Sequence, residues 1–135
     1  MAEGYSHVRA DDVERRERKG GGASSQDFAG STDCDHITCR VWVFHPGDQM
    51  AYHRHHEQEE LYHLILGGPQ EMLIEGEVVE VGDLDWIRVG KDTARRIQNN
   101  SDREAMWLII GAPPGTGITD GIRIDPGTGQ EIPRT

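Results

Sequence analysis

The chain has 135 residues, a length that suits one domain rather than two. Its net charge of −10 comes from 24 acidic and 14 basic residues, which argues against nonspecific binding to nucleic acid or to an anionic membrane. No run reaches the roughly 18 apolar residues of a membrane span, and the polar first 22 residues do not resemble a secretory signal. The two cysteines, Cys34 and Cys39, match no common metal or redox spacing, so a reducing cytoplasm is the expected location.

Residues 1–35 are charged at first and then rich in glycine and serine, so we expect a flexible N-terminal extension. Residues 11–18 contain a single apolar side chain, Val13, which favours disorder over the alternative of a short solvated helix with an aspartate cap. Residues 20–25 have the composition of a flexible linker.

Residues 36–112 alternate between short apolar segments and turns, and 17 glycines in the chain disfavour helices. Eight short strands at regular spacing predict an all-β sandwich or small barrel, which can enclose one small site. The predicted strands are 37–44, 50–56, 61–66, 71–75, 78–81, 86–89, 96–98 and 105–110.

Residues 113–135 are rich in proline and glycine, with isoleucines spaced between them. We expect a flexible tail that lies over the surface of the domain, with room for one short added strand.

Histidine is concentrated in one part of the chain, since five of the seven lie between His45 and His63. His53 and His55 are two residues apart, so on a strand both imidazoles project from one face, as two ligands of one metal ion do. Glu60 begins the next apolar strand, and a hairpin would return its carboxylate to the same ion. If the hairpin shifts by one residue, Glu59 takes that place.

The spacing of Gly47, His53, His55, Glu60 and Gly67 resembles the first sequence motif of the cupin family. The resemblance extends over the whole strand-and-turn region, residues 36–112. It implies a double-stranded β-helix, which is a jelly-roll barrel of six to eight strands with a metal site inside. It also implies a homodimer, because cupins are often dimeric.

The second cupin motif is incomplete: Asn99 fits the family's asparagine, but Arg95 stands where the resemblance implies a fourth ligand, a histidine. Arginine cannot ligate a metal ion, and two interpretations stay open. In one, His53, His55 and Glu60 still bind a divalent ion (Fe, Mn, Ni or Zn), and Arg95 receives an anionic group of the substrate. In the other, Arg95 pairs with Glu60 and replaces the charge of the metal.

Among the remaining polar residues, Tyr62 should share the inward face with Glu60, as a hydrogen-bond donor or a proton carrier. The other histidines of the cluster are expected outside the site. His56 and His63 should lie on the surface, and His45 should cap the turn at residues 46–47, with a stand-in fourth ligand as the alternative for His45. Four large aromatic residues are expected in the core, with a pocket wall as the alternative: Trp42, Tyr52, Trp86 and Trp107.

The sequence therefore predicts a cupin-barrel protein that binds a divalent metal ion and a small anionic molecule. Its activity would be that of a metal-dependent dioxygenase or isomerase, with Tyr62 and Arg95 as catalytic residues. The alternative is a non-enzymatic barrel that binds a small molecule, with Arg95 in place of the metal charge.

Overall fold

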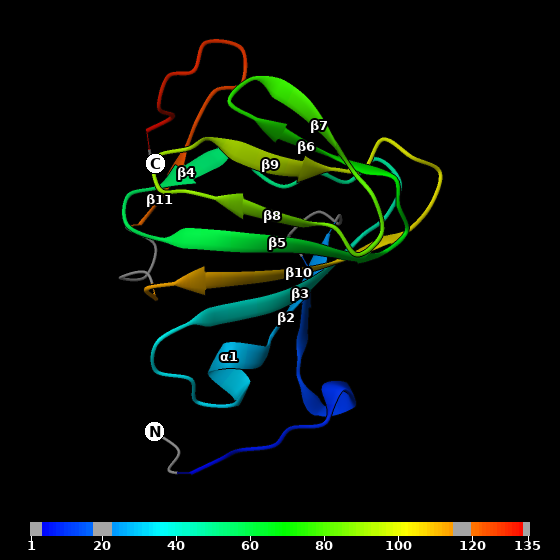
Figure 1. The fold of residues 1–135 in the computed structure, drawn as a ribbon, viewed down its shortest axis with the longest axis vertical. Helices are drawn as coiled ribbons and strands as arrows, with labels where there is room; N and C mark the ends of the chain where they lie inside the picture. The colour runs from blue at the N-terminus through cyan, green and yellow to red at the C-terminus, as the bar shows by residue number, and fades with distance from the viewer. Residues whose placement is uncertain (1–3, 18–22, 115–119, 134–135) are drawn as a thin grey trace.

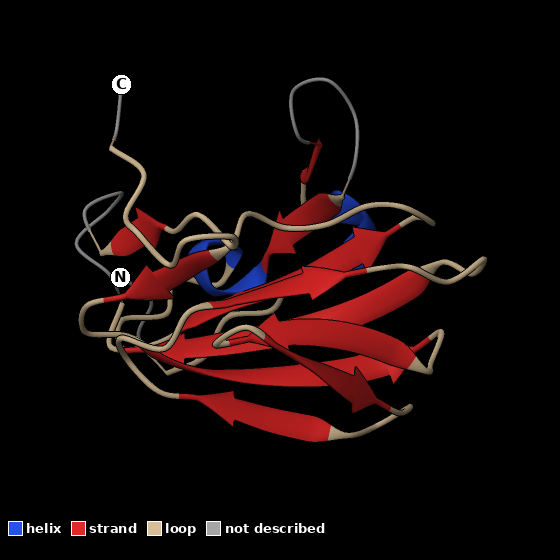
Figure 2. Cartoon of the chain, turned by 90° about the horizontal axis from the view of Figure 1, so that it is seen from above, coloured by secondary structure: helices blue, strands red, loops and turns tan. Residues whose placement is uncertain are grey.

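The computed structural model describes residues 4–17, 23–114 and 120–133, which form two packed antiparallel sheets (Figure 1, Figure 2). In spatial order the larger sheet contains β1 (Arg15–Glu17), β2 (Ser24–Asp27), β3 (Thr38–Phe44), β10 (Ala105–Ala112), β5 (Glu59–Leu66) and β8 (Trp86–Val89). The smaller sheet contains β11 (Gly121–Arg123), β4 (His53–His55), β9 (Arg95–Gln98), β6 (Gln70–Ile74) and β7 (Glu77–Val81). The helical segments are a 3₁₀ turn, η1 (Ala10–Asp12), and α1 (Phe28–Ser31). The predicted all-β jelly-roll fold is confirmed.

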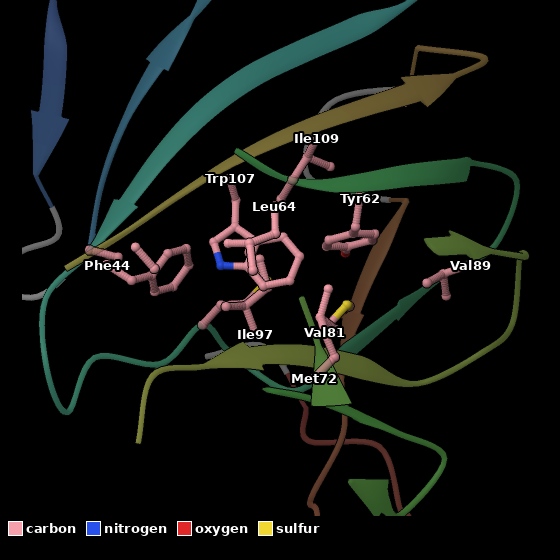
Figure 3. Close-up of a cluster of buried hydrophobic side chains, with 12 residues drawn as sticks. Phe44, Tyr62, Leu64, Met72, Val81, Val89, Ile97, Trp107 and Ile109 are labelled. Atoms are coloured by element: carbon pink, nitrogen blue, oxygen red, sulfur yellow. The ribbon is translucent and has the colours of Figure 1, made fainter. Parts of the chain in front are cut away.

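The core lies between the two sheets, where alternate side chains of each strand point inward. In Figure 3, Trp107 and Leu64 of the larger sheet point toward Met72 and Ile97 of the smaller one, and all four have 0% exposure. A slip of one residue in β5 or β10 would turn Leu64 or Trp107 to the outer face of the sheet. Packing of the core therefore fixes the strand register that positions the site.

The large aromatic residues divide between core, cavity and surface. Trp107 and Tyr52 are buried as predicted, and Trp42 packs against the core while also lining a cavity. Trp86 contradicts the expectation, since it is 55% exposed. Its neighbours on β8, Ile87 and Val89, face the core, so the alternation of the strand turns Trp86 outward.

The N-terminal region is more ordered than its composition suggests. Residues 24–27, of which the first two were expected in a linker, form β2 and pair with β3, while residues 20–22 lie outside the described residues. Residues 11–17 form neither a disordered segment nor an α-helix, since they end η1 and contain β1, and residue 18 is not described. The Gln26 side chain donates to the carbonyls of Ala10 (2.9 Å) and Val13 (3.0 Å). Backbone pairing with the edge of β3, the hydrogen bonds of Gln26 and Arg15, and the burial of Val13 and Ala23 hold the segment. None of these produces a local hydrophobic pattern in the sequence.

The C-terminal region adds the one short strand that the sequence left room for. β11 pairs with β4, and the amide of Ile124 donates to the carbonyl of Tyr52 at 2.8 Å. Strand pairing therefore extends beyond both ends of the segment predicted as the barrel, residues 36–112. Within the described part of the chain, no helix is long and apolar enough to cross a membrane.

Candidate functional site

A cavity of about 430 Å³ lies on the inner side of β3, β4, β5 and β10. This volume falls at the lower end of the range of roughly 300–1,000 Å³ found for small-molecule sites. The predicted residues His53, His55, Glu60 and Tyr62 all line it. The two histidines come from the smaller sheet and the other two from the larger sheet, so the packing of the sheets brings the four together.

His53 and His55 lie side by side on β4, with ring centroids 5.0 Å apart and ring planes at 87°. Each Nδ1 has its own oxygen partner: the carbonyl of Ala51 at 2.7 Å for His53, and Oδ2 of Asp120 at 2.9 Å for His55. An acceptor at Nδ1 favours the tautomer that carries the hydrogen there, which leaves Nε2 as the metal-ligating atom. Burial lowers the pKa of His53 to about 4, so this imidazole is neutral at pH 7, as metal binding requires.

Asp120 is a site residue that the sequence analysis missed. Its side chain is 5% exposed, and its Oδ1 accepts the backbone N–H of Glu57 at 2.9 Å while Oδ2 bonds His55. Burial alone raises the pKa of Asp120, but the hydrogen bonds from Glu57 and His55 outweigh it and the pKa lies below its usual range. Asp120 lies 65 residues after His55, just before β11, and no local motif marks it.

Glu60 lies at the centre of the site. Its Oε1 accepts hydrogen bonds from the Tyr62 hydroxyl and from Nη2 of Arg95, both at 2.8 Å, and lies 3.6 Å from Nε2 of His55. Ligand atoms of His53, His55 and Glu60 all lie within 4.8 Å of one another. Two imidazoles and one carboxylate are the donor set of the 2-His-1-carboxylate metal sites, so these residues fit a divalent ion.

Arg95 lies behind Glu60 and Tyr62, with 0% exposure, and is not among the described residues that line the cavity. Its Nε donates to Oη of Tyr62 at 3.2 Å and its Nη1 donates to the carbonyl of Thr93 at 2.6 Å. Burial lowers the pKa of Arg95, but Tyr62 and Glu60 outweigh burial and raise it overall. This geometry corresponds to the second interpretation of the sequence, in which Arg95 pairs with Glu60.

Tyr62 connects Arg95 to the cavity, where its side chain is 1% exposed. Burial and the neighbouring Glu60 both raise its pKa, so the hydroxyl keeps its proton at neutral pH and donates a hydrogen bond to Glu60. The predicted inward face of β5 is thus confirmed for Glu60 and Tyr62, and Leu64 lies on the same face.

The remaining histidines of the cluster lie outside the site, as predicted. His45 pairs with Asp48 (3.3 Å) at a turn, His56 is exposed, and His63 stacks on Trp86 with ring centroids 3.8 Å apart.

Contacts in the structure show the positions of two further motif residues, Glu59 and Asn99. Glu59 does not replace Glu60, because it points outward and pairs with Arg88 at 2.6 Å. Asn99 is fully buried and structural, since its amide donates to the carbonyls of Phe44 and Arg103.

The family described as "Cupin domain" matches residues 40–111, which is more than half of the chain. The chain belongs to the cupin family. No curated protein matches the sequence of this cupin.

Solved structures that resemble this cupin share its fold at low sequence identity. A sugar phosphate isomerase of the cupin superfamily from Silicibacter pomeroyi is 17% identical with a TM-score of 0.73, over 89% of this chain and 87% of that one. A predicted oxalate decarboxylase from Thermotoga maritima is 17% identical with a TM-score of 0.66, over 81% and 100%. A polyketide cyclase from Streptomyces resistomycificus is 17% identical with a TM-score of 0.67, over 82% of each chain. Because the names differ so widely, the shared fold does not define the reaction.

Proposed function

We propose that this cupin binds one divalent metal ion through His53, His55 and Glu60 and converts a small organic molecule in the adjoining cavity. The observation that carries the proposal is the convergence of the three donors, with each imidazole oriented by its own Nδ1 partner. Such orienting partners are a regular feature of histidine ligands in metal sites.

His53, His55 and Glu60 would hold the ion, which would supply Lewis-acid polarisation for an isomerisation or, as iron, the redox chemistry of a dioxygenase. The protein's own residues supply orientation. Tyr62 and Arg95 both donate to Oε1 of Glu60 and hold this carboxylate in place. Because its pKa is raised, Tyr62 stays protonated at neutral pH and acts as a hydrogen-bond donor to Glu60, not as a base.

The second candidate function is a metal-free barrel that binds a small molecule. The pairing of Arg95 with Glu60 favours it, because a buried cation at 2.8 Å already compensates the carboxylate. A metal ion beside Arg95 would also be repelled by the guanidinium. The two candidates differ in one measurable property, the metal content.

Elemental analysis of the protein, purified without a metal-affinity tag and then reconstituted with Fe(II), Mn(II), Ni(II) or Zn(II), tests the proposal. We expect about one ion per chain for at least one metal, and its loss in a His53→Gln, His55→Gln double variant. His63→Gln is the matched control, because His63 stacks on Trp86 outside the site. Less than about one tenth of an ion per chain after reconstitution would favour the metal-free alternative.

We also propose that the chain forms a homodimer through the outer face of the larger sheet. Leu61 and Trp86 leave 39% and 55% of their surface exposed on the outward sides of β5 and β8. These two exposed apolar side chains offer a contact to a second copy of the chain. Light scattering should give two chains per particle, and Trp86→Glu should shift the particle to one chain. A cytoplasmic location stays a prediction from the sequence.

A further inference from the structure

The cavity carries a cationic residue that the proposed chemistry does not use. Arg40 of β3 lines the cavity and lies in register with Ile109 of β10, which lies in register with Tyr62 of β5. Because neighbouring strands are about 4.8 Å apart, the backbone of Arg40 is roughly 10 Å from that of Tyr62. A ligand that spans the cavity along Arg40, Ile109 and Tyr62 would have one end at His53 and His55 and the other at the guanidinium of Arg40.

The guanidinium of Arg40 is only loosely held. Its Nη1 lies 3.4 Å from Oγ of Ser25, and its Nη2 lies 3.6 Å from Oδ2 of Asp27. Charge-assisted pairs are typically at about 2.7–2.9 Å, so neither contact is a tight one. Asp27 is also engaged elsewhere, since its Oδ1 caps α1 by accepting the amide of Gly30 at 2.8 Å. With a side chain 37% exposed, Arg40 retains donors for a ligand.

Two other polar side chains of the cavity wall, Thr38 and Gln58, bond to the protein itself. The amide of Gln58 donates to Oγ1 of Thr38 at 3.1 Å and to the carbonyl of Pro113 at 3.2 Å. The hydroxyl of Thr38 donates in turn to the carbonyl of Gly111. A ligand with many hydroxyl groups would find few partners here, and its buried polar groups would stay unpaired. Ile109 lies between Arg40 and Tyr62 in the strand register, and Trp42 and Met50 are further apolar residues of the cavity wall.

We infer that the cavity accepts a small, flat, largely apolar monocarboxylate, with its carboxylate on Arg40 and its body beside Trp42. The planar fork of a guanidinium matches a carboxylate, and Asp27 at 3.6 Å disfavours a dianion such as a phosphate ester or oxalate. This inference rests on the proposed function only for the position of the reacting end at His53, His55 and Glu60. Arg40, and not the buried Arg95, is then the cation that the substrate meets.

Calorimetric titration with 2-naphthoate tests the inference, on both metal-free and Zn(II)-loaded protein. The comparison ligands are 2-naphthalenemethanol, which lacks the charge, and ribose 5-phosphate and oxalate, which lack the apolar body. We expect 2-naphthoate to bind most tightly, and Arg40→Gln to weaken its binding about tenfold without changing that of the alcohol. Arg40→Lys should retain part of the affinity, because it keeps the charge but not the fork.

Arg88→Gln is the matched control, since it removes the same charge from the outer face of β8, where Arg88 pairs with Glu59. Its affinity for 2-naphthoate should stay within about twofold of the wild type. Equal binding of acid and alcohol, no effect of Arg40→Gln, or tighter binding of ribose 5-phosphate or oxalate would each overturn the inference. Loss of metal binding alone would not, because the effect of Arg40 is also measured in the metal-free protein. A thermal melt of each variant shows that it is folded.

Discussion

The site has two sides that meet at Glu60, and they differ in what they contribute. On one side, His53 and His55 present imidazoles that suit a metal ion, while on the other Arg95 places a permanent cation against the same carboxylate. The imidazole side is open to the cavity, whereas the guanidinium is fully buried. If an ion binds, Arg95 would compete with it for the negative charge of Glu60. Variants on either side can therefore separate the two contributions.

The largest expected effect is on stability, from Glu60→Gln. This change leaves the guanidinium of Arg95 buried without its counter-charge, which costs about 3–5 kcal/mol of unfolding free energy. Denaturant unfolding of the metal-free protein measures it. Glu59→Gln is the control, since the exposed pair of Glu59 with Arg88 should contribute less than about 1 kcal/mol. Equal stability of the two variants would mean that the buried pair is not formed.

The next effect is on metal affinity, from Arg95→His. Arg95 lies directly opposite His53 in the register of β9 and β4, so an imidazole there begins beside the other ligands. The change adds a ligand and removes a cation, and we expect Zn(II) to bind about a hundredfold more tightly. Competition with a chelator of known affinity measures this. Arg95→Leu removes the cation without adding a ligand and should give a smaller gain. Weaker binding by the histidine variant would show that position 95 does not face the ion.

Asp120→Ala tests the orientation of the imidazole side. Without the carboxylate at Nδ1, His55 loses its preferred tautomer, and Zn(II) affinity should fall about tenfold or more. The nitrogen chemical shifts of His55 should show a mixture of tautomers in the metal-free variant, which a purely structural role of Asp120 would not produce. Asp120→Asn keeps an acceptor and should restore part of the affinity. An unchanged tautomer would contradict the assignment of Asp120 as a positioning residue.

The smallest expected effect is on the pH dependence of stability. It arises from His53 and not from the pair of Arg95 with Glu60. Burial lowers the pKa of His53 to about 4 in the folded state, below the ordinary value of 6.5. The unfolded chain therefore takes up this proton first, so stability falls as the pH drops from about 6.5 toward 4. In metal-free protein, the unfolding free energy of the wild type should fall by about 1 kcal/mol more than that of His53→Gln between pH 7 and 5.5. Parallel pH profiles would show that His53 is not desolvated.

The strands and the histidine–glutamate spacing could be predicted because they are local. Alternation within β5 is enough to place Glu60, Tyr62 and Leu64 on one face, and the two-residue interval does the same for His53 and His55. The position of Arg40 on the cavity wall also follows from a local pattern. Arg40 alternates with Thr38 and Trp42 along β3, so its inward direction follows from the period of the strand.

Sequence alone determined the all-β fold, the three metal-ligand candidates and the unusual arginine at position 95, since each depends on residue type and short-range spacing. Only the tertiary structure decided that Arg95 lies behind Glu60 and that Asp120 reaches His55 from 65 residues away. Those contacts depend on how two sheets pack and which segments extend their edges. Which of these contacts form depends on how whole strands compete for pairing partners and for space in the core. No short segment of the sequence determines that outcome.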